Sequence, residues 1–378
     1  MDNPVSSAPV PTARLFTVGL AVMLGVLAMM LAIPHDPYVR WQMTTTEAFA
    51  RLGWIYERAH FDPTPVDVAV VGTSHTMNGI DGLAVARGLA DRGVRTADGR
   101  CPTVTNFAVP MFGRNMHYAV AREVLARKPR LMVLEVLENE TRKPHPLFYR
   151  VATTHDLLSA PVLLNTDFAL DLMRLPWRQV VAGVETLAPA EFGLKRQWSP
   201  ADYDGSTVDN TRMINVGGQA LTPPWTRVMP EERLKQESAA VMARKNLNFL
   251  PKSLARYEYA VPDRYVPGIL DLARQAGTPV LLLYLPGYGR PAAPYDMRLY
   301  DGARMVAIND ILARTDIWHD IDHLNAKGAA LASARLAELL APMLRHGEAG
   351  AGVTDAGACD WGFGARPTLR PFRAQKAS

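Results

Sequence analysis

The sequence has little net charge and no basic footprint. Its 378 residues include 41 Lys and Arg against 37 Asp and Glu, which leaves a formal net charge of only +4. The basic residues are scattered and are not interleaved with aromatic residues, which argues against nucleic acid as a partner. The chain also has no internal repeat. With 48% hydrophobic residues, it is long enough for one large domain or two modest ones.

Cysteine is scarce, and the two that are present lie far apart. Cys101 falls in the first third of the chain and Cys359 in a Gly-rich tail over residues 346–378. In an exported protein such a pair can form one disulfide, which here would tie the tail to the core. The alternative is two unrelated free thiols, and the sequence leaves both open.

One long stretch lacks charge altogether. Leu15 to Ile33 holds nineteen uncharged residues, enough for a helix of roughly 28 Å, about one hydrocarbon core. A cleaved signal peptide has a shorter apolar region and a small-x-small site, to which only "LAMMLA" is close. A buried soluble helix is the less favoured alternative, because apolar residues cover every face. We therefore expect an uncleaved anchor over residues 1–34, and its short head favours a protein that lies mostly outside the cytoplasm.

After a connector over residues 35–65 with helical spacing, the pattern alternates between strands and helices. The expected strands and helices of residues 66–140 are, in order, Val66–Val71, Ile80–Gly93, Val104–Val109, Arg114–Lys128 and Leu131–Leu137. Nearly continuous apolar strands that alternate with helices predict a parallel sheet covered on both faces. The fold class is therefore α/β.

The alternation breaks over residues 141–262, which we interpret as an insertion, mainly helical. This segment is rich in Pro and holds Trp177, Trp198 and Trp225, with helices expected within Asp167–Leu187 and Glu231–Arg244. Its aromatic residues would either stack on sugars or form the core of a lid. The alternation resumes over residues 263–345, where the expected elements are a helix at Val266–Gly277, a strand at Pro279–Pro286, a helix within Tyr300–Arg314 and a last helix at Ala326–Leu344.

Polar residues stand where the first strand ends and before the last helix. Ser74 follows the first strand in "VVGTSHT", and ligands of parallel sheets bind beyond the carboxyl ends of the strands. A serine there can also be a helix N-cap. Asp320 and His323 are three residues apart in "HDIDHLN", a spacing that lets the carboxylate orient the imidazole toward a serine hydroxyl. A metal cluster of His319, Asp320 and His323 is the alternative.

These blocks resemble the SGNH (GDSL-type) hydrolase and acyltransferase superfamily. That family has a serine after the first strand, a glycine after the second, an asparagine after the third and an Asp-x-x-His before the last helix. The matching residues here are Ser74, Gly113, Asn139 and the pair Asp320 and His323. The resemblance covers residues 66–140 and 266–344. It implies a flavodoxin-like, three-layer α/β/α fold with a parallel sheet.

The resemblance also implies roles. Ser74 would be the nucleophile, His323 the general base and Asp320 its orienting carboxylate, with the Ser74 backbone N–H, the Asn139 amide and the Gly113 N–H as oxyanion donors. The third block departs from the family, since Leu137 replaces its glycine. The expected pocket residues are His75, Glu138 and Asn106. Glu135, a single charge inside an apolar strand, needs a buried partner that the sequence does not identify.

The anchor narrows the resemblance to a membrane-anchored subgroup. This subgroup is similar to polysaccharide O-acetyltransferases and to the teichoic-acid D-alanyl transfer protein. It implies transfer of an acyl group, most simply acetyl, to a glycan acceptor without a cofactor, beside a multi-spanning membrane acyltransferase as donor. It places the chain in a bacterial inner membrane, with its catalytic domain facing the periplasm or cell exterior. An esterase or deacetylase, or a non-catalytic scaffold of such a complex, is the alternative.

Overall fold

The protein is an α/β protein built on a five-stranded, all-parallel sheet. The computed structural model describes residues 12–43, 51–162, 165–200, 214–216, 219–221, 226–243, 250–300, 302–345 and Cys359. The strands of the sheet, in spatial order, are β2 (Val104–Asn106), β1 (Val68–Val71), β3 (Leu131–Val136), β6 (Val280–Tyr284) and β7 (Arg304–Ala307). All four neighbouring pairs are parallel. The predicted parallel sheet is therefore confirmed.

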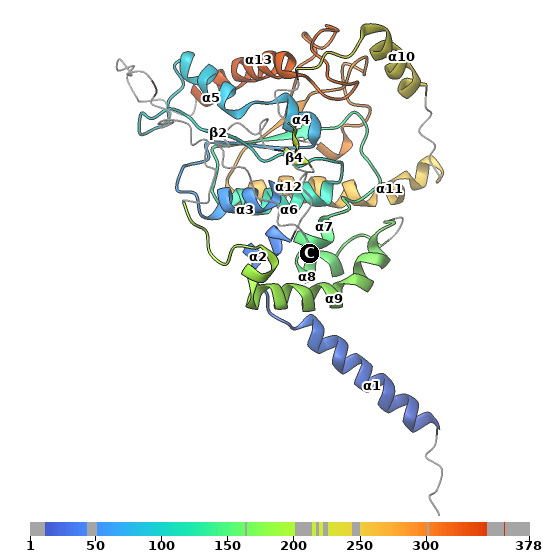
Figure 1. Cartoon of the computed structure of the whole chain (residues 1–378). Coiled ribbons are helices and arrows are strands. Elements are labelled where there is room, and N and C mark those ends of the chain that lie inside the picture. The colour runs from blue at the N-terminus through green and yellow to red at the C-terminus, as the bar shows by residue number, and fades with distance from the viewer. Residues whose placement is uncertain are drawn as a thin grey trace, which may run out of the picture.

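Helices cover both faces of the sheet (Figure 1). One face carries α5 (Gly82–Asp91) and α13 (Ala326–Arg345), and the other carries α3 (Arg51–His60), α6 (Arg114–Leu125) and α12 (Ala260–Ala276). Alternate residues of β1 serve the two faces, as a strand requires. Val68 and Val70 pack into the cluster that contains α5 and α13. Ala69 and Val71 pack into the cluster on the opposite face.

One expectation about this core is confirmed and one is wrong. The helix expected over Ile80–Gly93 is α5, which begins after Asp81, whose side chain caps it by accepting from the Ala84 N–H. A further short helix, α4 (Ser74–Gly79), precedes it and follows β1 directly. The region Tyr300–Arg314, expected to be helical, contains strand β7 instead. This edge strand is only four residues long and half-exposed, and Gly302, at φ +79°, opens it with a turn. Its apolar residues therefore lack the continuous run of the central strands.

The described part of the insertion is mainly helical, as predicted. Its described elements are α7 (Phe148–Val151), α8 (Thr154–Leu158), α9 (Phe168–Leu187), η2 (Pro189–Phe192), the hairpin of β4 (Ile214–Val216) and β5 (Gln219–Leu221), α10 (Glu231–Met242), η4 (Lys252–Leu254) and α11 (Ala255–Glu258). Trp225 lies outside the described residues. Helix α12 starts at Ala260, earlier than predicted, because Pro262 is accommodated near its N-terminus.

The N-terminal helix α1 (Thr12–Leu31) projects from the rest of the molecule (Figure 1). Its apolar segment Ala13–Leu31 is long and apolar enough to cross a membrane and is not buried by the protein. The connector that follows folds back onto the body through α2 (Pro37–Gln42), in which Trp41 is fully buried. The connector is thus part of the globular unit, whereas α1 is not.

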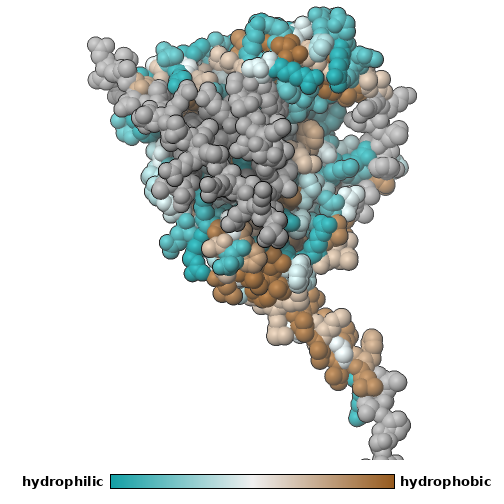
Figure 2. Space-filling model, viewed as in Figure 1, coloured by the Kyte–Doolittle hydropathy of each residue, from teal (hydrophilic) through white to brown (hydrophobic). Residues whose placement is uncertain are grey.

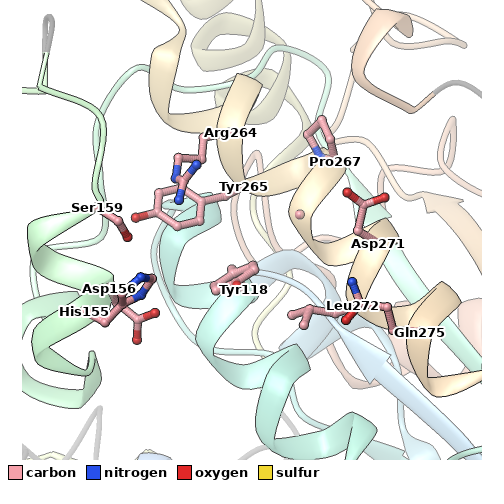
Figure 3. Close-up of a pocket in the computed structure, with 11 residues that line it drawn as sticks. Tyr118, His155, Asp156, Ser159, Arg264, Tyr265, Pro267, Asp271, Leu272 and Gln275 are labelled. Carbon is pink, nitrogen blue, oxygen red and sulfur yellow. The ribbon is translucent and has the colours of Figure 1, made fainter.

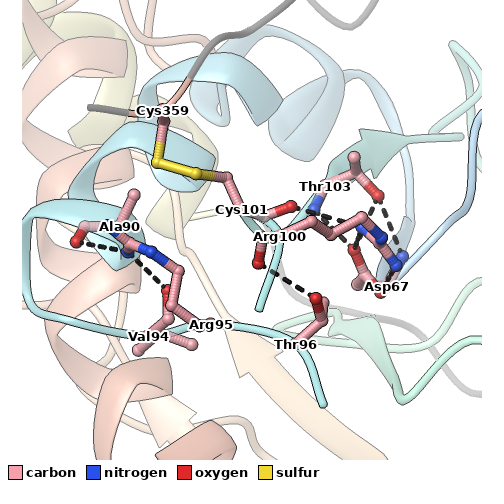
Figure 4. Close-up of a disulfide and its surroundings, with 9 residues drawn as sticks. All are labelled: Asp67, Ala90, Val94, Arg95, Thr96, Arg100, Cys101, Thr103 and Cys359. Carbon is pink, nitrogen blue, oxygen red and sulfur yellow. Dashed lines mark hydrogen bonds and ion pairs between the residues drawn. A yellow bond between two sulfur atoms is a disulfide. The ribbon is translucent and has the colours of Figure 1, made fainter. Parts of the chain in front are cut away.

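The two cysteines are joined (Figure 4). Cys101 and Cys359 form a disulfide with their Cα atoms 5.9 Å apart, so the disulfide prediction is confirmed and the free-thiol alternative is wrong. The loop that carries Cys101 is held by an ion pair in which the guanidinium of Arg100 donates to both oxygens of Asp67, at 2.6 and 2.8 Å. The bond therefore fixes one point of the C-terminal tail against the start of β2.

Candidate active site

The turn after β1 presents Ser74. Thr73, rather than Ser74, is the N-cap of α4, because its hydroxyl accepts from the His75 N–H at 3.2 Å. The alternative that Ser74 is the N-cap of the following helix is therefore wrong. The hydroxyl of Ser74 is available for another partner. Ser74 itself is half-buried at the first position of the helix.

That partner is His323. The Nε2 of His323 lies 2.8 Å from Ser74 Oγ, and its Nδ1 lies 2.9 Å from both carboxylate oxygens of Asp320. Burial acts to raise the pKa of Asp320, but the hydrogen bond from His323 and backbone N–H groups outweigh it and lower this pKa to about 2. The three residues meet as the sequence predicts, in the arrangement of a serine–histidine–carboxylate triad.

The loop that carries Asp320 and His323 is fixed from two sides. Its two ends pair with each other, since Asn325 N–H donates to Ile317 O at 2.8 Å. The turn after β6 packs against its middle, where Tyr288 N–H donates to Ile321 O at 2.8 Å. Gly287 permits this close approach, because a Cβ there would lie 2.7 Å from the same Ile321 oxygen.

The carboxylate of Asp320 in the "HDIDH" segment is engaged within its own loop as well as by His323. One oxygen of Asp320 also accepts from the backbone N–H groups of Asp322 and His323, at 2.9 and 2.8 Å. Within the described ranges, no group of three His, Cys, Asp or Glu side chains is placed to hold a metal ion. The backbone of His319 is held within the loop, because its backbone N–H donates to the backbone oxygen of His323 at 2.9 Å.

Glu135 supplies a buried support for the turn that carries Ser74. Its carboxylate accepts from the Thr73 N–H, from the Thr73 hydroxyl at 2.9 Å and from the Thr76 hydroxyl at 2.7 Å. A Cβ on Gly72 would collide with the same carboxylate. The buried partner that the sequence required is therefore the "GTSHT" turn itself. The signal was present in the lone charge of an apolar strand and in the two threonines that flank Ser74 and His75.

His75, one of the expected pocket residues, lies beside the triad. Its ring meets that of His323 edge-on, with centroids 5.6 Å apart, and its Nδ1 lies 3.8 Å from Glu135. Burial lowers the pKa of His75, against the opposing effect of Glu135. A neutral imidazole in this position packs against His323 and limits the orientations that the His323 ring can take.

Asn106 supports α4, the helix that begins at Ser74, and does not line an open pocket. It is fully buried, and its Nδ2 donates to Thr76 O and Ile80 O at 2.9 and 2.8 Å. Its Oδ1 accepts from the Ala108 N–H at 3.0 Å. The pocket role is therefore wrong, since both donor bonds of this amide tie β2 to α4 and its C-cap residue, and its oxygen bonds within the segment that follows β2.

The segment after β3 presents Asn139 between two anchored glutamates. Glu138 accepts from the Gly287 N–H at 3.0 Å and pairs with Arg290, while Glu140 pairs with the buried Arg114 at 2.6 Å. Burial raises the pKa of Glu138 against the opposing Arg290. Asn139 is exposed, and none of the hydrogen bonds found among the described residues joins it to Ser74. Its role as an oxyanion donor stays a prediction.

Gly113 occupies a position that only glycine tolerates. It precedes α6 with φ +144°, and a Cβ there would collide with the backbone and side chain of His145. The His145 N–H in turn donates to Asn115 Oδ1 at 2.8 Å. Close packing of the insertion onto α6 therefore explains this glycine without the oxyanion role, which stays a prediction.

A cavity of about 380 Å³ opens away from the triad, between α6, α8 and α12 (Figure 3). Its polar lining includes Tyr118, His155, Ser159, Arg264 and Asp271. These residues belong to the sheet face that carries α6 and α12, and no member of the triad contributes to it. The cavity therefore offers no route to Ser74.

The arrangement around Ser74 is suited to nucleophilic acyl chemistry. A serine hydroxyl within hydrogen-bond reach of a histidine, itself oriented by a carboxylate, is the signature of an activated nucleophile. Arg290 adds a half-buried cation next to the triad loop, since it donates to Asp322 at 3.0 Å. Comparison of the chain with protein-family models and with curated protein sequences finds no match, so any functional assignment rests on this geometry.

Proposed function

We propose that the protein is a membrane-anchored serine acyltransferase of the SGNH type that esterifies a cell-envelope or secreted polysaccharide. The observation that carries the proposal is the contact of 2.8 Å between Ser74 Oγ and His323 Nε2, with His323 Nδ1 held 2.9 Å from Asp320. The acyl group is short, most simply acetyl.

The chemistry proceeds through an acyl-serine. Ser74 Oγ attacks the ester carbonyl of the donor while His323 Nε2 takes the hydroxyl proton. His323 then gives this proton to the departing group of the donor. In the second half, a sugar hydroxyl loses its proton to His323 and attacks the acyl carbon, and Ser74 leaves with that proton. Asp320 orients the imidazole and stabilises its protonated form.

The negative charge that develops on the carbonyl oxygen in the transition state is stabilised by preorganised hydrogen-bond donors. The proposed donors are the Ser74 N–H, the Asn139 amide and the Gly113 N–H, and one such donor typically contributes about 3–4 kcal/mol in the transition state. Asn139 is exposed without substrate, so in this proposal it engages the oxygen only when the substrate covers it.

The topology is compatible with an SGNH fold. When the core strands β1, β2, β3, β6 and β7 are numbered one to five, their spatial order is 2-1-3-4-5, the doubly wound order of flavodoxin-like proteins. The SGNH three-layer arrangement is part of the proposal.

The anchor favours transfer over hydrolysis. The catalytic residues act alike in both, since only the acceptor differs, water or a sugar hydroxyl. A helix long enough to span a membrane supports the proposal, because it would keep the enzyme at the membrane that holds the proposed donor, a multi-spanning membrane acyltransferase. The disulfide fits a domain outside the cytoplasm, in the periplasm or at the cell exterior.

The test is a comparison of polysaccharide from wild-type and Ser74→Ala strains by NMR, with the exposed Ser253→Ala as matched control. Ester signals should disappear only in Ser74→Ala, with chain length and yield unchanged. Increased esterification in that strain would identify a deacetylase. Unchanged esterification contradicts the transferase.

A fluorophosphonate probe on the purified full-length protein separates an enzyme from a scaffold. Labelling that is lost in Ser74→Ala and kept in Ser253→Ala supports catalysis, because the probe reacts only with an activated serine. The departure at Leu137 and the exposure of Asn139 favour the scaffold as the second candidate. A folded protein that takes up no probe would establish it.

Orientation is tested independently of activity. A reporter that is active only in the cytoplasm, fused after Ser378, should be silent. A bright cytoplasmic signal refutes both the orientation and the envelope function.

A further inference from the structure

Helix α9 exposes its apolar side to solvent. The exposed apolar residues form what we call the α9 stripe, which consists of Leu170, Met173, Trp177, Val184 and Leu187. The exposed fractions of Met173, Trp177 and Leu187 are 77%, 66% and 77%. Side chains of this size are seldom left so bare along a whole helix unless something covers them.

The stripe is continuous around the helix axis. At about 100° per residue, its five residues fall within an arc of about 100°, and the other α9 residues on or bordering that arc, Ala169, Pro176, Val180 and Val181, are also apolar. The opposite side is buried against the body through Leu175, Arg178, Gln179, Ala182 and Gly183. The helix therefore buries two polar side chains, Arg178 and Gln179, and leaves an apolar side exposed. Arg178 donates to Tyr149 O and Ala152 O at 2.7 and 2.6 Å.

The stripe lies where the candidate membrane span ends. Gln179 Nε2 donates to Leu31 O, the last residue of α1, at 3.3 Å, and Gly183 packs directly against Ile33. Asp36 N–H donates to Thr186 Oγ1 at 3.0 Å. Helix α9 is thus fastened along its second half to the residues that leave the span. In Figure 1 it forms the base of the body above α1, and in Figure 2 this base is brown.

We propose that α9 lies in the interface of the same lipid bilayer that α1 spans, as a second membrane contact. The span ends at Leu31, so whatever is bonded to Leu31 and Ile33 must lie at the level of the headgroups. Interfacial helices bury an apolar face at the boundary between headgroups and acyl chains. Trp177 within the stripe and the exposed Arg174 beside it are residue types that suit this depth.

Lipid is the proposed occupant of the α9 stripe because the stripe adjoins the end of the membrane span. A protein partner seated on the stripe would have to displace the lipid that surrounds the end of α1. The proposal rests on α1 spanning a membrane and is independent of the catalytic role of Ser74.

Site-directed spin labelling tests the proposal on the full-length protein in vesicles of phosphatidylethanolamine and phosphatidylglycerol. The native cysteines are joined in a disulfide, so a single added cysteine is labelled selectively. The three variants are Met173→Cys on the stripe, Met23→Cys on α1 and Glu232→Cys on the exposed side of α10. Power saturation then compares collisions of each label with oxygen, which dissolves in lipid, and with a water-soluble nickel complex.

We expect the Met173→Cys label to favour oxygen, at a depth of about 5–10 Å, between a deeper Met23→Cys label and a water-exposed Glu232→Cys label. A Met173→Cys label that behaves like Glu232→Cys overturns the proposal while Met23→Cys still reports the span. A label shielded from both reagents identifies a protein contact and also overturns it. A Met23→Cys label in water refutes the span, and the proposal with it.

Discussion

Replacing Glu135 with glutamine should loosen the turn that carries Ser74. The carboxylate accepts three hydrogen bonds from Thr73 and Thr76. Glutamine keeps the size of the side chain but makes one end a donor, which faces a hydroxyl or N–H that already donates. Hydrogen bonds to charged groups contribute about 1.5–3 kcal/mol and neutral ones about 0.5–1.5 kcal/mol. A loss of about 1 kcal/mol for each of three bonds gives about 3 kcal/mol in the free energy of unfolding.

Two measurements follow this change in the full-length protein. The Tm should fall by about 4 °C, because an unfolding entropy of about 2.1 cal/mol/K per residue amounts to about 0.8 kcal/mol/K for a chain of this length. Labelling of Ser74 by a fluorophosphonate should slow roughly tenfold, because a displaced Ser74 that raises the activation free energy of labelling by about 1.4 kcal/mol lowers the rate by one factor of ten. Glu232→Gln, at an exposed position on α10, is the matched control and should change neither quantity.

The combination of results decides the argument. An unchanged Tm and an unchanged labelling rate would refute the claim that Glu135 holds the turn. A lower Tm with wild-type labelling would mean that the carboxylate stabilises the sheet without positioning the serine, which also contradicts the reasoning. An alanine substitution is less informative, since it leaves several buried donors unpaired and risks unfolding the protein.

Three further changes test other parts of the structure. Asp320→Asn should slow probe labelling by about 10³–10⁴-fold. Because the pKa of Asp320 is lowered to about 2, the stabilising effect of its carboxylate is fully present above about pH 4 and is lost as pH falls through about 2. The Tm difference between wild type and variant should therefore stay constant from pH 7 to 5 and shrink only below about pH 4. Cys359→Ser opens a disulfide between residues 258 positions apart and should destabilise the protein by up to about 5 kcal/mol, and reductant should lower the Tm of wild type but not of the variant. Gly287→Val places a side chain against Ile321 O and should slow labelling by displacing the triad loop, whereas wild-type rates would show that the loop is held without that contact.

The core and the triad could be predicted from the sequence because their signals are local. Buried parallel strands are continuous apolar runs, and β1, β3 and β6 read plainly as such. Asp320 and His323 are three residues apart, so one turn of chain brings them together. Ser74 joins them because parallel strands and the loops after them end at one edge of the sheet.

The remainder depends on contacts between distant segments. The partner of Glu135 lies in the turn after the neighbouring strand β1, 59 to 62 residues away, and no spacing in the sequence predicts that these strands are neighbours. Strand β7 is short and half-exposed at the edge, so its composition does not separate it from a helix. The amide of Asn106 gave no sign that all its groups would be occupied, since burial is a property of the assembled fold.

The layers of the fold determine how far Ser74 lies from the bilayer surface when α9 is placed in that surface. Helix α4, which begins at Ser74, packs with α13 on the far side of the sheet from α9. Between them lie the sheet and the layer of α6 and α12 (Figure 1). Packed layers are about 10 Å apart, so with α9 at the bilayer surface the serine stands roughly 20–30 Å above it. Under the proposed function, an acyl group dissolved in the membrane would not cover that distance unaided, so the proposed donor would have to present it in the aqueous space, where a hydrated polymer is nearer than a lipid.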